Sequence, residues 1–352
     1  MKNIKLVVAY DGTNYSGWQI QPNAVTIEQL LDKAINSLTG ENIHVTGASR
    51  TDAGVHAMGN VAVFKTNSTI PGRRWAYAIN RFLPDDIVVQ ASWEVEKNFH
   101  PRHCNTVKTY EYKILNTPFP FPKERNYSWH VSHDLNINNM KEAAQILIGE
   151  HDFKSFCCVR TQTESTVRHI YSIEIIKENI YNKNISEKIS NKYNNDSIKK
   201  NGDNNKNCLD MKASDNMSGL SDKIFGKNYK VNKSFEHTED NDLYMISTLN
   251  GLGYIILDDK LQNNNVSAAN RADNISNGSY ITIRIKGNGF LYNMVRIIAG
   301  TLMQVGRGQL TPAAVQNMLL SKDRCSAGQT APPQGLTLMG IDYVDGDDKE
   351  IV

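Results

Sequence analysis

The apolar residues of the first hundred positions follow two spacings, which separate predicted strands from predicted helices. Residues 4–10 are rich in β-branched and apolar side chains and stop at Asp11-Gly12, which is typical of a strand that ends in a turn. Apolar residues at helical spacing then lie between a Thr26-x-x-Gln29 capping box and Gly40. The pattern predicts strand, helix, strand, strand, helix and strand, over residues 4–10, 27–38, 43–46, 61–64, 73–82 and 87–93. This order is that of a split βαβ, or ferredoxin-like, unit.

The second part of the chain repeats this order of elements. Strands are predicted over residues 109–115, 169–176, 279–286 and 340–344, and helices over 140–148, 290–305 and 312–320. Two tandem ferredoxin-like (RRM-like) units predict an α+β fold with one mainly antiparallel sheet, helices on one face, and a central cleft for a ligand. We expect residues 1–105 to form the N-terminal half and residues 106–352 the C-terminal half.

A segment of different composition interrupts the second unit at about residues 178–278. It is rich in Asn, Lys, Ser and Asp and poor in apolar residues, so it cannot bury enough surface to fold alone. Within it, two apolar runs flank Asn250-Gly251, which predicts a hairpin over residues 243–257. We interpret the rest of this segment as a disordered insert in a hairpin loop.

The charge balance does not by itself indicate a nucleic-acid-binding protein. The formal net charge is +2, so an RNA site must come from a local cluster of Lys and Arg. The five cysteines are odd in number and contain no Cys-x-x-Cys pair, which indicates reduced thiols. The first apolar run ends at Tyr10 and is too short for a signal sequence or a membrane span. We therefore expect a cytoplasmic protein without a membrane segment.

One stretch, residues 47–57, concentrates candidate chemistry between two short apolar runs. It holds Arg50, Asp52 and His56 together with Gly47 and Gly54, which indicates a loop that presents charge. An ionised Asp52 can act as a nucleophile or as a base, and a nearby arginine would favour its charged form. The alternative is an ordinary turn, in which Asp52 bonds backbone amides and Gly54 takes a positive φ.

Six ordered segments narrow this choice. They are Ala9–Gln19, Arg50–Ala57, Lys108–Tyr112, Gly287–Arg296, Ala327–Pro332 and Gly335–Leu338. Together they resemble the motifs of the TruA family of tRNA pseudouridine synthases, over everything except the insert. The resemblance implies the pseudouridine synthase fold and a reaction that needs no cofactor and no metal.

The resemblance also implies roles for four residues. Asp52 matches the catalytic carboxylate, either nucleophile or base, and Arg296 matches the arginine that pairs with it. Tyr110 matches the tyrosine that stacks on the flipped uracil, with its hydroxyl near C5. Leu336 matches a leucine that lines the uracil pocket. Tyr112, two residues along the same strand from Tyr110, serves as a comparison because we expect it to lie in the core.

Further residues are candidates for RNA contacts. We expect Arg50 both to shape the loop and to contact RNA where the target base is extruded, and His56 either contacts phosphate or bonds only backbone. Arg102 and Lys108 are candidates for phosphate contacts. By resemblance, the chain isomerises uridines at positions 38, 39 and 40 of the tRNA anticodon stem-loop and works as a homodimer.

Two other functions remain compatible with the residues alone. A non-catalytic RNA-binding protein could contain two RRM-like units, although the chain lacks the aromatic string of RNA-recognition modules. Another enzyme with an aspartate nucleophile could act on a glycosidic bond. The reaction product separates the three functions, since they give an isomer, unchanged RNA or a free base.

Overall fold

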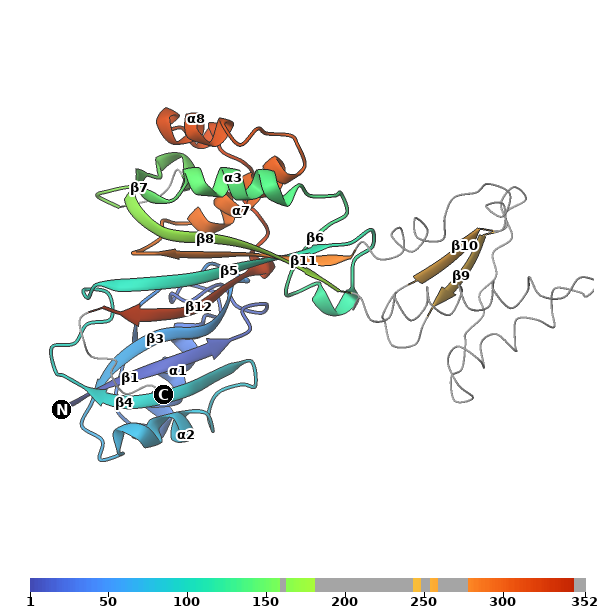
Figure 1. Cartoon of the computed structure of the whole chain (residues 1–352). Helices are drawn as coiled ribbons and strands as arrows, with labels where there is room; N and C mark the ends of the chain where they lie inside the picture. Colours follow the sequence, from blue (N-terminus) through green and yellow to red (C-terminus); the bar gives the residue numbers. More distant parts are fainter. Residues whose placement is uncertain (159–162, 181–242, 248–253, 259–277, 345–352) are drawn as a thin grey trace, which may run out of the picture. The chain divides into compact units, whose positions relative to one another are not determined.

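The computed structural model describes residues 1–158, 163–180, 243–247, 254–258 and 278–344 (Figure 1). The chain divides into two compact units, residues 1–178 with 279–352, and residues 179–278. None of the helices in the described ranges is long and apolar enough to cross a membrane.

One large sheet organises the first unit. Its strands follow the order β4-β1-β3-β12-β5-β11-β8-β7, with β2 paired to β3 and β6 paired to β5 (Figure 1). Most of the pairings whose register is described are antiparallel, whereas β12 with β3 and β5 with β6 are parallel. The strands are β1 (Lys2–Tyr10), β2 (Thr46–Gly47), β3 (His56–Thr66), β4 (Ile87–Val95), β5 (Thr106–Asn116), β6 (Trp129–Val131), β7 (Gly149–Asp152), β8 (Val167–Asn179), β11 (Ser279–Gly287) and β12 (Leu336–Tyr343). The predicted α+β class with one mainly antiparallel sheet is confirmed.

The helices form two groups along the sheet. Figure 1 shows α1 and α2 with the β1–β3–β4 part, and α3, α7 and α8 near the β8 end. They are α1 (Ile27–Thr39), α2 (Trp75–Ile79), α3 (Ile137–Ile146), α7 (Met294–Gly306) and α8 (Ala314–Ser321). Helix α7 is buried over most of its length, because its apolar residues pack into the core from more than one side.

Strands differ in burial according to their place in the sheet. Along β11 the residues alternate between buried and half-buried, with Ile281, Ile283 and Ile285 facing the core. Strand β3 is buried over nearly its whole length and lies in the interior of the sheet, between β1 and β12.

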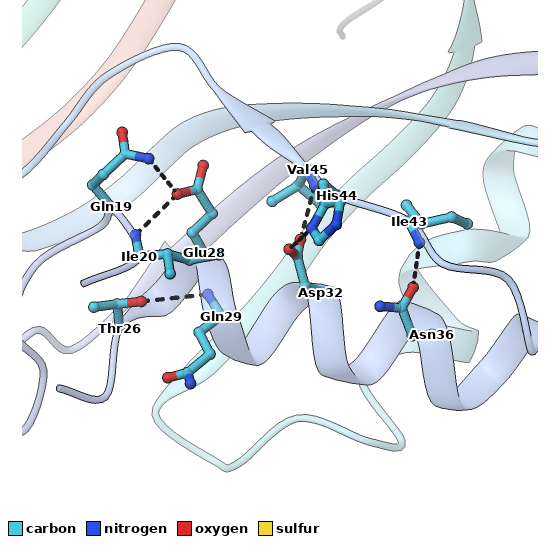
Figure 2. A network of polar contacts seen from close by, with 10 residues as sticks. All are labelled: Gln19, Ile20, Thr26, Glu28, Gln29, Asp32, Asn36, Ile43, His44 and Val45. Carbon is cyan, nitrogen blue, oxygen red and sulfur yellow. Dashed lines mark hydrogen bonds and ion pairs between the residues drawn. The ribbon is translucent and has the colours of Figure 1, made fainter. Parts of the chain in front are cut away.

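The strand predicted over residues 43–46 was wrong for most of its length. Only Thr46–Gly47 pairs with β3 as a strand. The backbone N–H of Ile43 donates to Asn36 Oδ1 at 2.7 Å, and that of Val45 donates to Asp32 Oδ1 at 2.8 Å (Figure 2). Side chains of α1 thus satisfy donors that a longer strand would have given to a neighbour.

Several predicted boundaries also differ from the structure. The helix predicted over 73–82 is a 3₁₀ turn (Gly72–Arg74) followed by α2, and it ends where the Asn80 side chain bonds both backbone groups of Val89. The helix predicted from residue 290 begins at Met294, after Asn293 in the left-handed conformation. The last strand begins at Leu336 and not at residue 340, and β6 and β7 were not predicted.

The second unit contains a two-stranded antiparallel sheet. Strands β9 (Leu243–Ser247) and β10 (Tyr254–Asp258) pair with Tyr254 opposite Ser247. The predicted hairpin strands are confirmed. The prediction of disorder for the rest of residues 178–278 falls almost entirely outside the described residues.

Candidate active site

The Asp52 loop connects β2 to β3 and contains a tight turn. The Val55 N–H donates to the Asp52 carbonyl oxygen at 3.2 Å, and Gly54 has φ +76°. This is the turn that the alternative reading expected, with the glycine where a positive φ is needed. The Asp52 carboxylate nevertheless contacts a distant arginine, so the turn and a chemical role are compatible.

The segment after β1 holds this loop in place. The Trp18 N–H donates to the Thr51 carbonyl oxygen at 3.1 Å, and the Gly54 N–H donates to the Tyr15 carbonyl oxygen at 3.2 Å. Gly17 has φ +88°, and a Cβ there would lie 2.5 Å from the Thr51 oxygen. Two backbone segments are therefore packed too closely for any side chain at residue 17.

The nearby α1 network fixes a further side chain of this segment. Gln19 Nε2 donates to Glu28 Oε2 at 2.9 Å, and the Ile20 N–H donates to the same oxygen at 3.1 Å (Figure 2). Thr26 caps the helix by accepting from the Gln29 N–H at 3.4 Å. The helix start predicted from the capping pattern is confirmed, and it orients Gln19 beside the cavity described below.

Asp52 and Arg296 meet although they are 244 positions apart in the sequence. Arg296 Nη1 donates to Asp52 Oδ2 at 3.4 Å, and the two side chains are 15% and 17% exposed. The same Nη1 donates to Asn293 Oδ1 at 2.9 Å, and Nε donates to the Ala331 carbonyl oxygen at 2.8 Å. The pair has one long contact, and the remaining bonds fix the guanidinium in position.

Burial and charge act in opposite directions on the Asp52 carboxyl. Its removal from water raises its pKa above the usual value, and the Arg296 guanidinium partly offsets this rise. Because burial is the larger effect, the pKa of Asp52 is raised overall. The arginine therefore favours the ionised form of this buried carboxylate.

Tyr110 lies in β5 and faces the same region. Its hydroxyl forms a 2.9 Å hydrogen bond with Ser49 Oγ, and its ring packs edge-on against Phe290 at 5.3 Å. Burial raises the pKa of Tyr110 to about 12, with a smaller contribution from the Asp52 charge. Tyr112 is fully buried and its hydroxyl donates to the Pro332 carbonyl oxygen at 2.8 Å, so its expected place in the core is confirmed.

The candidate site residues line one cavity of about 890 Å³. Asp52, Tyr110, Arg296 and Leu336 all line it, from the loop before β3, from β5, from α7 and from β12 respectively. Arg50, Arg102 and Lys108 line the same cavity. In the ranges that the structure describes, no group of three or more His, Cys, Asp and Glu residues could hold a metal ion.

Two cations of this cavity bind the backbone at the start of the Asp52 loop. Arg102 Nε donates to the Gly47 carbonyl oxygen at 2.6 Å, and Lys108 Nζ donates to the Ala48 carbonyl oxygen at 3.0 Å. Burial, together with the charges of Arg102 and Arg168, lowers the pKa of Lys108 to about 8. The wall of the cavity beside the loop is thus strongly positive.

His56 lies elsewhere. Its side chain is buried, its Nδ1 accepts from the Gly12 N–H at 3.0 Å, and its Nε2 donates to the Asn126 carbonyl oxygen at 2.8 Å. Nδ1 also lies 3.1 Å from Asp11 Oδ1. Because both ring nitrogens contact backbone groups and His56 does not line the cavity, the geometry favours the alternative of backbone bonding over phosphate contact.

Comparison with known proteins identifies the family. A family model described as tRNA pseudouridine synthase matches residues 6–103, 143–214 and 257–344, which together exceed half of the chain. The chain belongs to the tRNA pseudouridine synthase family. It is therefore an isomerase that acts on uridine in tRNA, which agrees with the predicted enzyme and not with the alternative of a non-catalytic RNA-binding protein.

Relatives in this family extend over nearly the whole chain. A protein named tRNA pseudouridine synthase A from Thermoanaerobacter sp. (strain X514) is 38% identical over 343 residues, 97% of this chain and 100% of the relative. A protein of the same name from Ruminiclostridium cellulolyticum is 37% identical over 344 residues, with the same coverage. A third, from Brevibacillus brevis, is 33% identical over 343 residues.

One predicted site residue lies outside the matched ranges, and two residues that bond site residues were not predicted from the sequence. Asp52, Arg296 and Leu336 fall within the matched ranges, whereas Tyr110 does not. Ser49 and Asn293 were not predicted, although they bond Tyr110 and Arg296 directly. Both belong to the motif segments or to the loop described above, so position next to a candidate residue was the available signal.

Proposed function

We propose that this synthase converts uridines at positions 38, 39 and 40 of the tRNA anticodon stem-loop into pseudouridine, with Asp52 as the catalytic carboxylate. The single observation that carries this proposal is the contact between Asp52 and Arg296 in a cavity that Tyr110 also lines. The choice of these tRNA positions rests on the resemblance of the motifs.

The reaction moves one bond within a nucleotide. The bond from C1′ to N1 breaks, the uracil rotates and a bond from C1′ to C5 forms. C5 loses its proton to solvent, and N1 gains a proton from solvent. Asp52 either attacks the substrate as a nucleophile or removes a proton to start elimination. In both cases it must be ionised, and Arg296 supplies the opposite charge that favours this form.

Tyr110 has two tasks in this proposal. Its ring stacks on the uracil, which keeps the cleaved base in the cavity while it rotates. Its hydroxyl, which is bonded to Ser49, is proposed to accept or relay the C5 proton. Leu336 supplies an apolar wall of the pocket.

The target uridine must leave its stack to enter a cavity of this kind. Base flipping costs a few kcal/mol, which phosphate contacts have to offset. Arg50, Arg102 and Lys108 are the proposed sources of these contacts because they line the cavity and are positively charged. His56 is not included, since its ring nitrogens bond backbone.

The finer fold, the assembly and the location are part of the same proposal. The strand orders β4-β1-β3-β2 and β12-β5-β11-β8 support two tandem ferredoxin-like units, with a boundary near residue 105. The homodimer and the cytoplasmic location rest on the resemblance and on the composition of the sequence.

Product analysis with a defined tRNA transcript tests the proposal. Digestion to nucleosides after incubation should give pseudouridine, and mapping of the modified sites should place it at positions 38, 39 and 40. Modification confined to other positions would contradict the proposed target, and free uracil without an isomer would contradict the proposed reaction.

A further inference from the structure

The cations on the wall of the cavity are held by backbone oxygens and not by carboxylates. Arg102 and Lys108 donate to the carbonyl oxygens of Gly47 and Ala48, the residues that lead into the Asp52 loop. Among the described residues, neither cation forms an ion pair with a carboxylate. Most of their N–H donors are therefore available to an anion in the cavity.

Lys108 lies close to Tyr110, the residue proposed to stack on the uracil. It lies two positions before Tyr110 in β5, so both side chains emerge on the same face of the strand, about 6.8 Å apart along it. A nucleotide whose base stacks on Tyr110 has a phosphate separated from that base by one ribose. If the uracil stacks on Tyr110 as proposed, we expect a backbone phosphate of the target nucleotide to lie near Lys108.

The charged groups described near Lys108 are mainly positive. Burial lowers the pKa of Lys108, and the positive charges of Arg102, from the segment between β4 and β5, and of Arg168, from β8, lower it further. The residues opposite it on β11 and β12 are Gly287 and Ile341, which carry no charge. Elsewhere in the same cavity lie Arg50 and the already paired Asp52.

We propose that Lys108 is a positioning residue, whose ammonium bridges the Ala48 carbonyl oxygen and a phosphodiester oxygen of the RNA beside the target uridine. This inference rests on the proposed function. The bridge connects the substrate backbone directly to the loop that carries Asp52. Phosphate binding and placement of the catalytic carboxylate are then coupled through one side chain.

A measurable consequence is a proton linkage. The free Lys108 has a pKa of about 8, and a bound phosphate raises it because an opposite charge favours the ammonium. Only the protonated form binds well, so affinity follows the protonated fraction of the free protein. That fraction falls about fourfold between about pH 7 and about pH 8.5, and the dissociation constant should rise by the same factor.

The test compares tRNA affinity at these two pH values and at constant ionic strength. Fluorescence anisotropy is recorded with labelled tRNA that has been fully converted beforehand, so that no turnover occurs during binding. Lys108→Arg keeps its charge throughout this range and should show no such rise. The matched control is Lys113→Arg, from the same strand but paired with Glu124 at 3.1 Å, which should keep the wild-type rise.

The outcomes are separable. A rise of about fourfold in wild type and Lys113→Arg, absent in Lys108→Arg, supports the proposal. Equal slopes in wild type and Lys108→Arg would overturn it, as would a flat response in wild type. Tritium release from [5-³H]uridine tRNA by wild type at about pH 7 tests the proposed function independently of these slopes.

A second variant separates positioning from a purely structural role. Lys108→Met should raise KM more than it lowers kcat near neutral pH, and its KM should no longer respond to pH. An unchanged KM in a folded variant would mean that Lys108 only supports the Ala48 carbonyl group, which would overturn the proposal.

Discussion

Replacement of Arg296 by lysine tests how the buried ion pair serves the reaction. The guanidinium bonds Asp52, Asn293 and Ala331 from two of its nitrogens at 3.4, 2.9 and 2.8 Å. A lysine ammonium keeps the positive charge but cannot reproduce this planar arrangement. Loss of one hydrogen bond to a charged group costs about 1.5–3 kcal/mol, which corresponds to a decrease of about 10- to 150-fold in kcat.

Single-turnover and steady-state tritium release provide the assay, with tRNA affinity measured in parallel. Arg296→Lys should lose turnover and keep most of its affinity, because Arg296 contacts the catalytic carboxylate. The matched control is Arg284→Lys, in a half-exposed pair with Glu111 at 2.6 Å, which should change turnover by less than about twofold. Equal losses of turnover and affinity in Arg296→Lys would refute this reasoning and indicate an RNA-contact role.

Three further predictions concern pH, proton transfer and backbone strain. Burial raises the pKa of the Asp52 carboxyl and Arg296 lowers it, so kcat should fall as the pH drops through this pKa. Arg296→Met should move this decrease in kcat to higher pH. If the decrease stays at the wild-type pH, the assignment of the titrating group to Asp52 is contradicted. Tyr110→Phe should keep the fold and decrease kcat by about 100-fold or more, whereas Ser49→Ala should decrease kcat much less. Equal kcat values in Tyr110→Phe and wild type would exclude a role for the Tyr110 hydroxyl in proton transfer. In Gly17→Ala the new Cβ would lie 2.5 Å from the Thr51 carbonyl oxygen, at a residue with φ +88°. Chemical denaturation should show that this variant lowers the free energy of unfolding by more than about 2 kcal/mol. Gly40→Ala, where a Cβ would meet no atom within 4 Å, should lower it by only about 1–2 kcal/mol.

Local signals in the sequence predicted the elements that depend on local physics. Helix α1 was expected over 27–38 and spans Ile27–Thr39, because its cap at Thr26 and its left-handed Gly40 are both written in neighbouring residues. The strand expected over 43–46 failed for the opposite reason. Asp32 and Asn36 reach across from α1, and hydropathy patterns contain no information about such contacts.

The site followed a similar division. Asp52 was found from its motif, and Arg296 was linked to it only by resemblance, since no spacing rule connects residues that are 244 positions apart. Asn293 escaped prediction because its left-handed backbone and its bond to Arg296 arise only when α7 is packed. The role of Lys108 likewise depends on a carbonyl group that lies 60 positions earlier in the chain.

The most direct test of the account is release of tritium from tRNA that carries [5-³H]uridine, with wild type and Asp52→Ala compared side by side. We expect wild type to release tritium and Asp52→Ala to release none, with tRNA binding and thermal stability retained in the variant. Release by Asp52→Ala at the wild-type rate would contradict the central claim that this carboxylate carries the reaction.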